Sequence, residues 1–219
     1  MTYSSVTPSG KSAGIMIAVC AGVGLISVLH HPSVAARAPA DLLAGIAAIA
    51  PMDRLVHGVL IAVMGMLLFG FSVFALRVGL GRGLVLAGLI AYTIGVGAMI
   101  GAALIDGFLI PDIASRSIGT SSQNVATTTQ LLSACALLIQ ILTKLGVAAV
   151  SIGIFAWSMD LVQRAGAARA AGIAGFASAA VPVAIIFAGP LGTHGIGAIV
   201  AIESIWYASV AALLISRRL

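Results

Sequence analysis

The sequence predicts an all-α, polytopic membrane bundle of six transmembrane helices. Hydrophobic residues make up 61% of the 219 residues and charged residues only 8%, and the mean hydropathy is +1.18. A soluble domain carries about 25% charged residues, so this chain has too few charges to cover the surface of a water-soluble globule. The composition also excludes a disordered chain, a collagen-like repeat and a disulfide scaffold.

Six separate stretches are long enough to cross a membrane, since a span needs about 20 mostly apolar residues. They leave a short amino-terminal tail, two longer loops and three tight turns, so residues 1–219 are expected to form one integral membrane domain. The first stretch is long for the core of a signal peptide, and we expect it to remain as an uncleaved span. The predicted spans cover residues 13–29, 58–76, 84–110, 131–159, 171–188 and 196–215.

The distribution of basic residues predicts the orientation, because cytoplasmic loops carry an excess of Lys and Arg. If the amino terminus is inside, seven basic residues lie on the inner side and three on the outer side, and both termini are expected in the cytoplasm. The net charge of +5 then reflects topology and not nucleic-acid binding, since no basic cluster is interleaved with aromatic residues. The inner residues are Lys11, Arg77, Arg82, Arg164, Arg169, Arg217 and Arg218, and the outer ones are Arg37, Arg54 and Arg116.

The two outer loops differ in character. Residues 30–54 are largely apolar, and Asp41 is positioned to cap a short helix that Pro51 would end, so we expect a helix lying in the outer interface. Residues 115–130 are rich in Ser, Thr and Asn and predict an ordinary solvated connection.

Small residues within the spans predict close helix packing, with Gly97 and Gly101 forming one pair of small residues four positions apart. Ala171 and Gly175 form another.

Ionisable residues inside spans are costly and are therefore candidates for function. On the fourth span a polar stripe containing Gln140 and Lys144 lies along one face, because the spacing follows the helical repeat. Glu203 in the sixth span has Tyr207 one turn away, and we predict that Lys144 pairs with Glu203. Such a pair would serve either as part of an ion or proton path or as a structural link between helices. Tyr92 and Asp106 share a face of span three and would extend this polar interior.

All four histidines fall at the predicted outer boundary. His30 and His31 end the first span, His57 opens the second, His194 opens the sixth, and Asp106 lies at the same level. Imidazoles and a carboxylate in one layer predict a site for zinc or copper at the periplasmic face, and two imidazoles could instead hold a haem. The alternative is that these histidines only reach toward water from the interface.

The last span and the start of the second carry a resemblance in layout. The runs Asp53-Arg54-Leu55-Val56-His57 and Glu203-Ser204-Ile205-Trp206-Tyr207, with six spans and a long first outer loop, resemble an uncharacterised family of small six-helix bacterial inner-membrane proteins. The resemblance implies a bacterial inner membrane and carries no function with it.

Three hypotheses follow, since no motif typical of a catalytic site is present. The protein binds or transports a small molecule or ion through a polar interior formed by Tyr92, Asp106, Gln140, Lys144, Glu203 and Tyr207. Alternatively, it binds a metal ion or haem at the periplasmic face, or it is a non-catalytic subunit of a larger complex. The expected partners are membrane lipid and other membrane subunits or further copies of the chain.

Overall fold

The structure is a computed structural model that describes residues 9–36 and 38–219, and these residues form an all-α fold. Six helical rods are long and apolar enough to cross a bilayer, which confirms the all-α part of the predicted fold class and indicates a multi-pass membrane protein. Arg37, one of the predicted outer charges, lies outside the described residues. In chain order the elements are α1 (Gly10–Leu29), α2 (Pro39–Val78), α3 (Gly83–Leu104), the π-helix η1 (Ile105–Leu109), α4 (Ile110–Arg116), α5 (Ser122–Leu161), α6 (Gly166–Ala188) and α7 (Thr193–Ser216).

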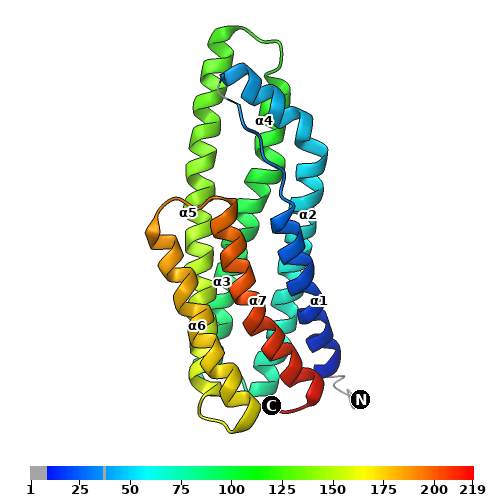
Figure 1. Cartoon of the computed structure of the whole chain (residues 1–219), viewed down its shortest axis with the longest axis vertical. Coiled ribbons are helices and arrows are strands. Elements are labelled where there is room, and N and C mark those ends of the chain that lie inside the picture. Colours follow the sequence, from blue (N-terminus) through cyan, green and yellow to red (C-terminus); the bar gives the residue numbers. More distant parts are fainter. Residues whose placement is uncertain (1–8, 37) are drawn as a thin grey trace, which may run out of the picture.

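The six rods close into a ring, with α3, η1 and α4 forming one continuous rod. Each rod packs against the next around the ring, in the order α1, α2, α3, α5, α6, α7 and back to α1. The start of α1 and the end of α7 lie at the same end of the bundle (Figure 1). We call this the inner end and the opposite one the outer end.

The helix expected in the first outer loop is not a separate element, because α2 runs unbroken through Pro51. The predicted helix end at Pro51 is therefore wrong. A proline inside a helix removes one backbone hydrogen bond and bends the helix without having to end it. The first turns of α2 cross the outer end obliquely before the helix follows the bundle axis (Figure 1). They pack on α4 and α5, where Leu43, Ala114 and Leu132 form a small buried cluster.

The solvated loop expected at residues 115–130 is mostly helical, which corrects a second prediction. Ser121 caps α5 by accepting a hydrogen bond from the backbone N–H of Asn124. The hydroxyls of Thr127 and Thr129 donate to backbone carbonyls four residues earlier, so these polar side chains are satisfied within the helix. At 1.5 Å per residue, the 40 residues of α2 and of α5 each span about 60 Å. That is roughly twice the apolar thickness of a bilayer.

Small residues allow close helix packing, as the sequence predicts, but not at every predicted position. A Cβ atom added to Gly95 of α3 would lie 2.7 Å from the carbonyl oxygen of Gly146 of α5. Gly175 is similarly tight against α5 and α7. A Cβ atom added to Gly97, in contrast, would meet no atom of another helix within 4 Å, because this glycine lies on the exposed side of α3. Its predicted packing role with Gly101 is therefore wrong.

A cluster of buried aromatic rings fills the inner half of the ring. Phe71 of α2 lies nearly parallel to Trp157 of α5 and to Trp206 of α7, with a centroid separation of 5.4 Å in each case. Tyr92 of α3 and Tyr207 of α7 lie 4.9 and 5.0 Å from the Phe71 ring. Because aromatic pairs at such distances add about 0.5–1.5 kcal/mol each to the burial of their area, the cluster ties four helices together.

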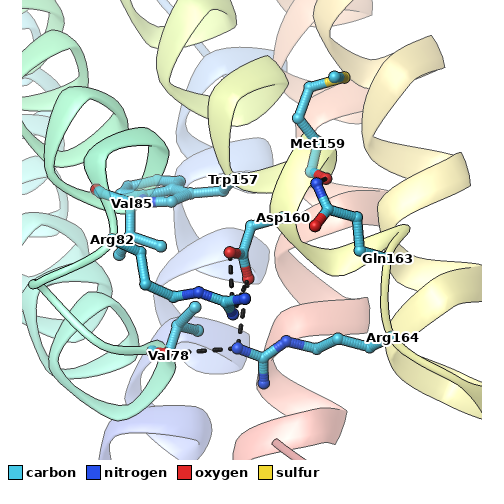
Figure 2. A network of polar contacts seen from close by, with 8 residues as sticks. All are labelled: Val78, Arg82, Val85, Trp157, Met159, Asp160, Gln163 and Arg164. Atoms are coloured by element: carbon cyan, nitrogen blue, oxygen red, sulfur yellow. Dashed lines mark hydrogen bonds and ion pairs between the residues drawn. The ribbon is translucent and has the colours of Figure 1, made fainter.

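A buried carboxylate joins the helix ends at the inner end of the bundle. Asp160 at the end of α5 is 4% exposed and accepts from Arg82, at the start of α3, and from Arg164 (Figure 2). Arg164 also donates to the carbonyl oxygen of Val78 at the end of α2. The ends of three helices are thus joined through one carboxylate and two guanidinium groups.

Candidate metal centre and internal cavity

A cavity of about 310 Å³ lies inside the helix ring. Its outer end is lined by His31, which follows α1, by His57 of α2 and by Asp106 of η1. Its inner end is lined by Cys20 and by Glu203, where it reaches the aromatic cluster. The remaining lining is mostly apolar side chains. The cavity therefore joins the predicted histidine layer to the predicted polar interior.

His57 is held by its own helix. Asp53 lies one turn earlier on α2, and the Nδ1 atom of His57 is 2.9 Å from the carbonyl oxygen of Asp53 and 3.1 Å from its carboxylate Oδ1. A carbonyl oxygen only accepts hydrogen bonds, so Nδ1 carries the proton and donates. A neutral imidazole with its proton on Nδ1 has a free electron pair on Nε2. Asp53 thus fixes both the orientation and the tautomer of His57.

The π-helix η1 brings Asp106 to this imidazole. Within η1 the N–H of Ile110 bonds to the carbonyl of Ile105, one residue further back than in an α-helix. Pro111 follows directly and has no N–H to continue the α-helical pattern. π-Helical turns of this kind are frequent at functional sites. The Oδ2 atom of Asp106 lies 3.4 Å from Nε2 of His57.

His31 completes the group from the segment after α1. Its Nε2 atom lies 3.3 Å from Nε2 of His57 and 3.8 Å from Oδ1 of Asp53. The ligand atoms of His31, Asp53 and His57 all lie within 4.8 Å of one another, a spacing that suits a metal ion. The side chains of His57 and Asp53 are buried, whereas His31 is 23% and Asp106 39% exposed, so the group is accessible from one side.

These distances give the group a definite chemical character. When its Nε2 is unprotonated, His57 directs the electron pair of this atom toward both His31 and Asp106. Nε2 of His57 thus has a donor atom on each of two sides, and a proton or a metal ion between them removes the repulsion of their electron pairs. Donors bound tetrahedrally to Zn²⁺ at 2.0–2.1 Å lie about 3.3–3.4 Å apart. Both distances from His57 Nε2 match that spacing.

The structure brings together only part of the predicted histidine layer. His31, His57 and Asp106 meet as described above. His30 is exposed and its Nδ1 bonds to the carbonyl of Ile26, one turn earlier on α1. His194 is exposed at the start of α7 and is not part of the group. All four histidines lie toward the outer ends of their helices, but only His31 and His57 are in contact with each other.

Most of the predicted polar interior does line the cavity, including Tyr92, Asp106, Gln140, Glu203 and Tyr207. The predicted pairing of Lys144 with Glu203 is wrong: no salt bridge joins them within the described residues, and Glu203 Oε2 instead accepts from the hydroxyl of Tyr207 at 3.2 Å. At this level α5 turns Thr143 and Val150 toward the cavity. Lys144 is therefore left half-buried at the edge of that face.

Gln140 has a structural partner at the outer end. Its amide nitrogen donates to the carbonyl of Leu191 at 2.7 Å, and its amide oxygen accepts from the N–H of Leu191 at 2.9 Å. Leu191 lies in the short segment between α6 and α7 and lines the cavity with Gln140. This side chain therefore fixes the turn that closes the ring at its outer end.

The sequence reasoning did not identify Asp53 or Gly107 as parts of the site. Asp53 precedes His57 by four residues, which places both on one helical face, and this spacing could have revealed it. The expected helix end at Pro51 and the expected span start after His57 hid that relationship. Gly107 had no sequence signal beyond its position next to Asp106.

The comparisons with known proteins provide no relative from which a role could be transferred. No protein-family model matches the chain, and neither the curated proteins nor the solved structures include a significantly similar one.

Proposed function

We propose that this membrane protein binds a divalent transition-metal ion, with Zn²⁺ as the best match, at the outer end of its cavity. His31, His57 and Asp106 would be the ligands. The observation that supports this most directly is the 3.3 Å separation of the two Nε2 atoms, together with the 3.4 Å separation of His57 Nε2 and Asp106 Oδ2. Two imidazoles and a carboxylate are ligands that Zn²⁺ accepts readily.

The surroundings of the ligands also favour a metal ion. Metal-bound histidines commonly donate their second ring N–H to a carboxylate or a backbone carbonyl, which orients the ring and raises its basicity. His57 has both kinds of partner in Asp53. Three protein ligands leave a fourth position for water or for a small molecule. Because the site lines the cavity, a bound ion also fits the broader expectation of a protein that binds or transports an ion.

A haem held between His31 and His57 fits the geometry less well. An iron atom with two axial imidazoles has them on opposite faces of the porphyrin. The rings of His31 and His57 instead meet edge to face with centroids 4.9 Å apart, so no porphyrin fits between them. We therefore favour a metal ion alone over a haem.

The proposal includes a location. The excess of basic residues at the inner end supports placing both chain termini in the cytoplasm, and the resemblance in layout implies a bacterial inner membrane. The metal site then faces the periplasm. A role as a subunit of a larger complex, or as a homo-oligomer, stays a prediction.

Metal analysis of the full chain, purified in mild detergent, tests the proposal. We expect close to one Zn²⁺ per chain after equilibration, and a visible absorption spectrum typical of tetrahedral coordination when Co²⁺ replaces it. His57→Ala should lower the affinity for Zn²⁺ by at least about a hundredfold, since even the loss of an outer hydrogen-bond partner costs 10- to 100-fold. His31→Ala should also lose the ion, and its exposure makes a folding defect less of a concern.

His194→Ala is the matched control, because His194 lies at the same level but outside the group. It should keep the affinity for Zn²⁺ of the unchanged protein. Wild-type protein that stays metal-free at saturating Zn²⁺ would overturn the proposal. So would folded His31→Ala and His57→Ala variants that bind the ion as tightly as His194→Ala.

A further inference from the structure

The inner end of the cavity contains an acidic side chain with no basic partner. Glu203 is 6% exposed and lines the cavity. One carboxyl oxygen accepts from Tyr207, but Oε1 has no hydrogen-bond partner, and the hydroxyl of the adjacent Ser204 has none either. A buried polar atom without a partner costs free energy that a bound ligand can recover.

The charge at the inner end favours a cation. Glu203 is the acidic residue there, the histidines of the lining lie at the outer end, and neither lysine nor arginine is among the described residues that line the cavity. Lys144, the basic residue expected here, lies outside the cavity. A buried carboxylate in an apolar surrounding stays ionised only beside a positive charge, and none of the described basic side chains pairs with Glu203, so a bound cation would supply that charge.

The size and the walls of the cavity favour an organic ligand over a second metal ion. A volume of about 310 Å³ is within the range of small-molecule sites, roughly 300–1,000 Å³. Most of the wall is apolar, with Leu67 and Val96 near the inner end. Tyr92 and Tyr207 add aromatic rings beside Glu203, and such rings attract cations over their faces.

We propose that the inner end of the cavity binds a small organic cation, either a quaternary ammonium or a protonated amine with apolar substituents. The positive charge lies beside Oε1 of Glu203. The substituents contact the apolar wall and the rings of Tyr92 and Tyr207. This inference does not depend on the metal site, because it rests on different residues at the opposite end of the cavity.

The protein contains its own reporter for this site. The chain has two tryptophans. The ring of Trp157 lies 5.4 Å from that of Tyr92, and the ring of Trp206 lies 6.0 Å from that of Tyr207. Every tryptophan therefore touches a side chain that lines the inner end, and a bound ligand there should change the intrinsic fluorescence.

The test is a titration of the detergent-purified full chain with benzyltrimethylammonium, followed by tryptophan fluorescence and by calorimetry. We expect saturable binding that neopentylbenzene, the uncharged carbon isostere, does not reproduce. Glu203→Gln should weaken binding at least about tenfold, because the glutamine keeps the shape and the bond to Tyr207 but removes the charge. Asp112→Asn, which removes an exposed carboxylate outside the cavity, should leave the affinity unchanged.

Three outcomes would overturn the inference: no saturable binding by the folded protein, equal binding of the uncharged isostere, or an unchanged affinity in a folded Glu203→Gln variant. His57→Ala separates the two proposals. It should lose Zn²⁺ and keep benzyltrimethylammonium, whereas Glu203→Gln should lose benzyltrimethylammonium and keep Zn²⁺. Either proposal can therefore fail without the other.

Discussion

The imidazole of His57 lies directly against the backbone of Gly107, so that a Cβ atom added to this glycine would lie 2.7 Å from Nδ1 of the ring. No other residue type leaves space for His57 at this position. The contact links α2 to the π-helix and places Asp106, the neighbour of Gly107, within reach of the same ring. His57 and Asp106 can therefore approach each other only because Gly107 has no side chain.

Gly107→Ala should displace His57 and weaken the binding of Zn²⁺. Overpacking of this kind also costs about 1–3 kcal/mol of the free energy of unfolding. Gly97→Ala is the control, because nothing lies within 4 Å of its added methyl group; it should be neutral or slightly stabilising in a helix. Metal affinity and thermal unfolding of both variants would check this, and equal metal affinities would contradict it.

Asp53→Asn should weaken Zn²⁺ binding about 10- to 100-fold without abolishing it. The asparagine keeps the backbone carbonyl that fixes the tautomer of His57 but removes the carboxylate that supports the ring. Asp41→Asn, an exposed position on the same helix, should change the affinity little. Competition with a chromophoric chelator would measure both. A complete loss of binding in Asp53→Asn would instead make this carboxylate a direct ligand.

Gln140→Leu should loosen the turn between α6 and α7. It leaves both backbone groups of Leu191 without their present partners, at a cost of about 1–3 kcal/mol if water cannot replace them. Hydrogen exchange at the Leu191 amide should become faster, while exchange at the inner end should not change. Gln163→Leu is a suitable comparison, since Gln163 bonds only within its own helix end. Unchanged protection at Leu191 would show that Gln140 does not hold the turn.

Asp160→Asn should lower the stability of the protein by about 1–3 kcal/mol. The buried carboxylate bridges Arg82 and Arg164, and charged hydrogen bonds of this kind contribute more than neutral ones. Asp112→Asn breaks the ion pair of Asp112 with Arg54, which is exposed, and should cost about 0–1 kcal/mol. Thermal unfolding in one detergent gives the comparison. Equal losses of stability would mean that the ion pairs of Asp160 with Arg82 and Arg164 contribute no more than the exposed pair.

Lys144→Met should change the affinities for Zn²⁺ and for benzyltrimethylammonium by less than about twofold, as expected for a position outside both sites. The sequence alone led to the opposite expectation, with Lys144 at the centre of an ion path. Ligand titrations of this variant beside Glu203→Gln would decide. A large loss in a folded Lys144→Met protein would restore the original hypothesis.

The sequence predicts depth in this fold far better than lateral position. Apolar run length places six helices, and the helix ends place His31, His57 and Asp106 at one level. Which helix ends are neighbours depends on the closure of the ring, and a linear pattern carries no information on that. From the sequence, His194 was therefore as good a candidate ligand as His31, whereas in the structure His194 lies exposed and outside the group.

The sequence predicted the helix ends less accurately than the helices themselves. The physical reason differs between the start of α2 and the start of α5. Pro51 is compatible with a continuing helix because packing of the first turns on α4 and α5 compensates for one lost hydrogen bond. Thr127 and Thr129 are compatible with a helix because their hydroxyls bond to the preceding turn. Both compensations depend on the folded structure, so composition alone suggested loops.

The unequal lengths of the helices determine how the protein matches the thickness of a bilayer. With 20, 23 and 24 residues, α1, α6 and α7 are about 30–36 Å long and match a hydrocarbon layer of about 30 Å. The 40-residue helices α2 and α5 cannot relieve their hydrophobic mismatch by tilting, because they are packed against shorter neighbours. All six rods overlap only along the length of the shorter helices, and His31 lies just beyond the outer end of α1. A bilayer matched to this shared part would leave the proposed ion site at the membrane surface, where an ion exchanges with water without entering the lipid.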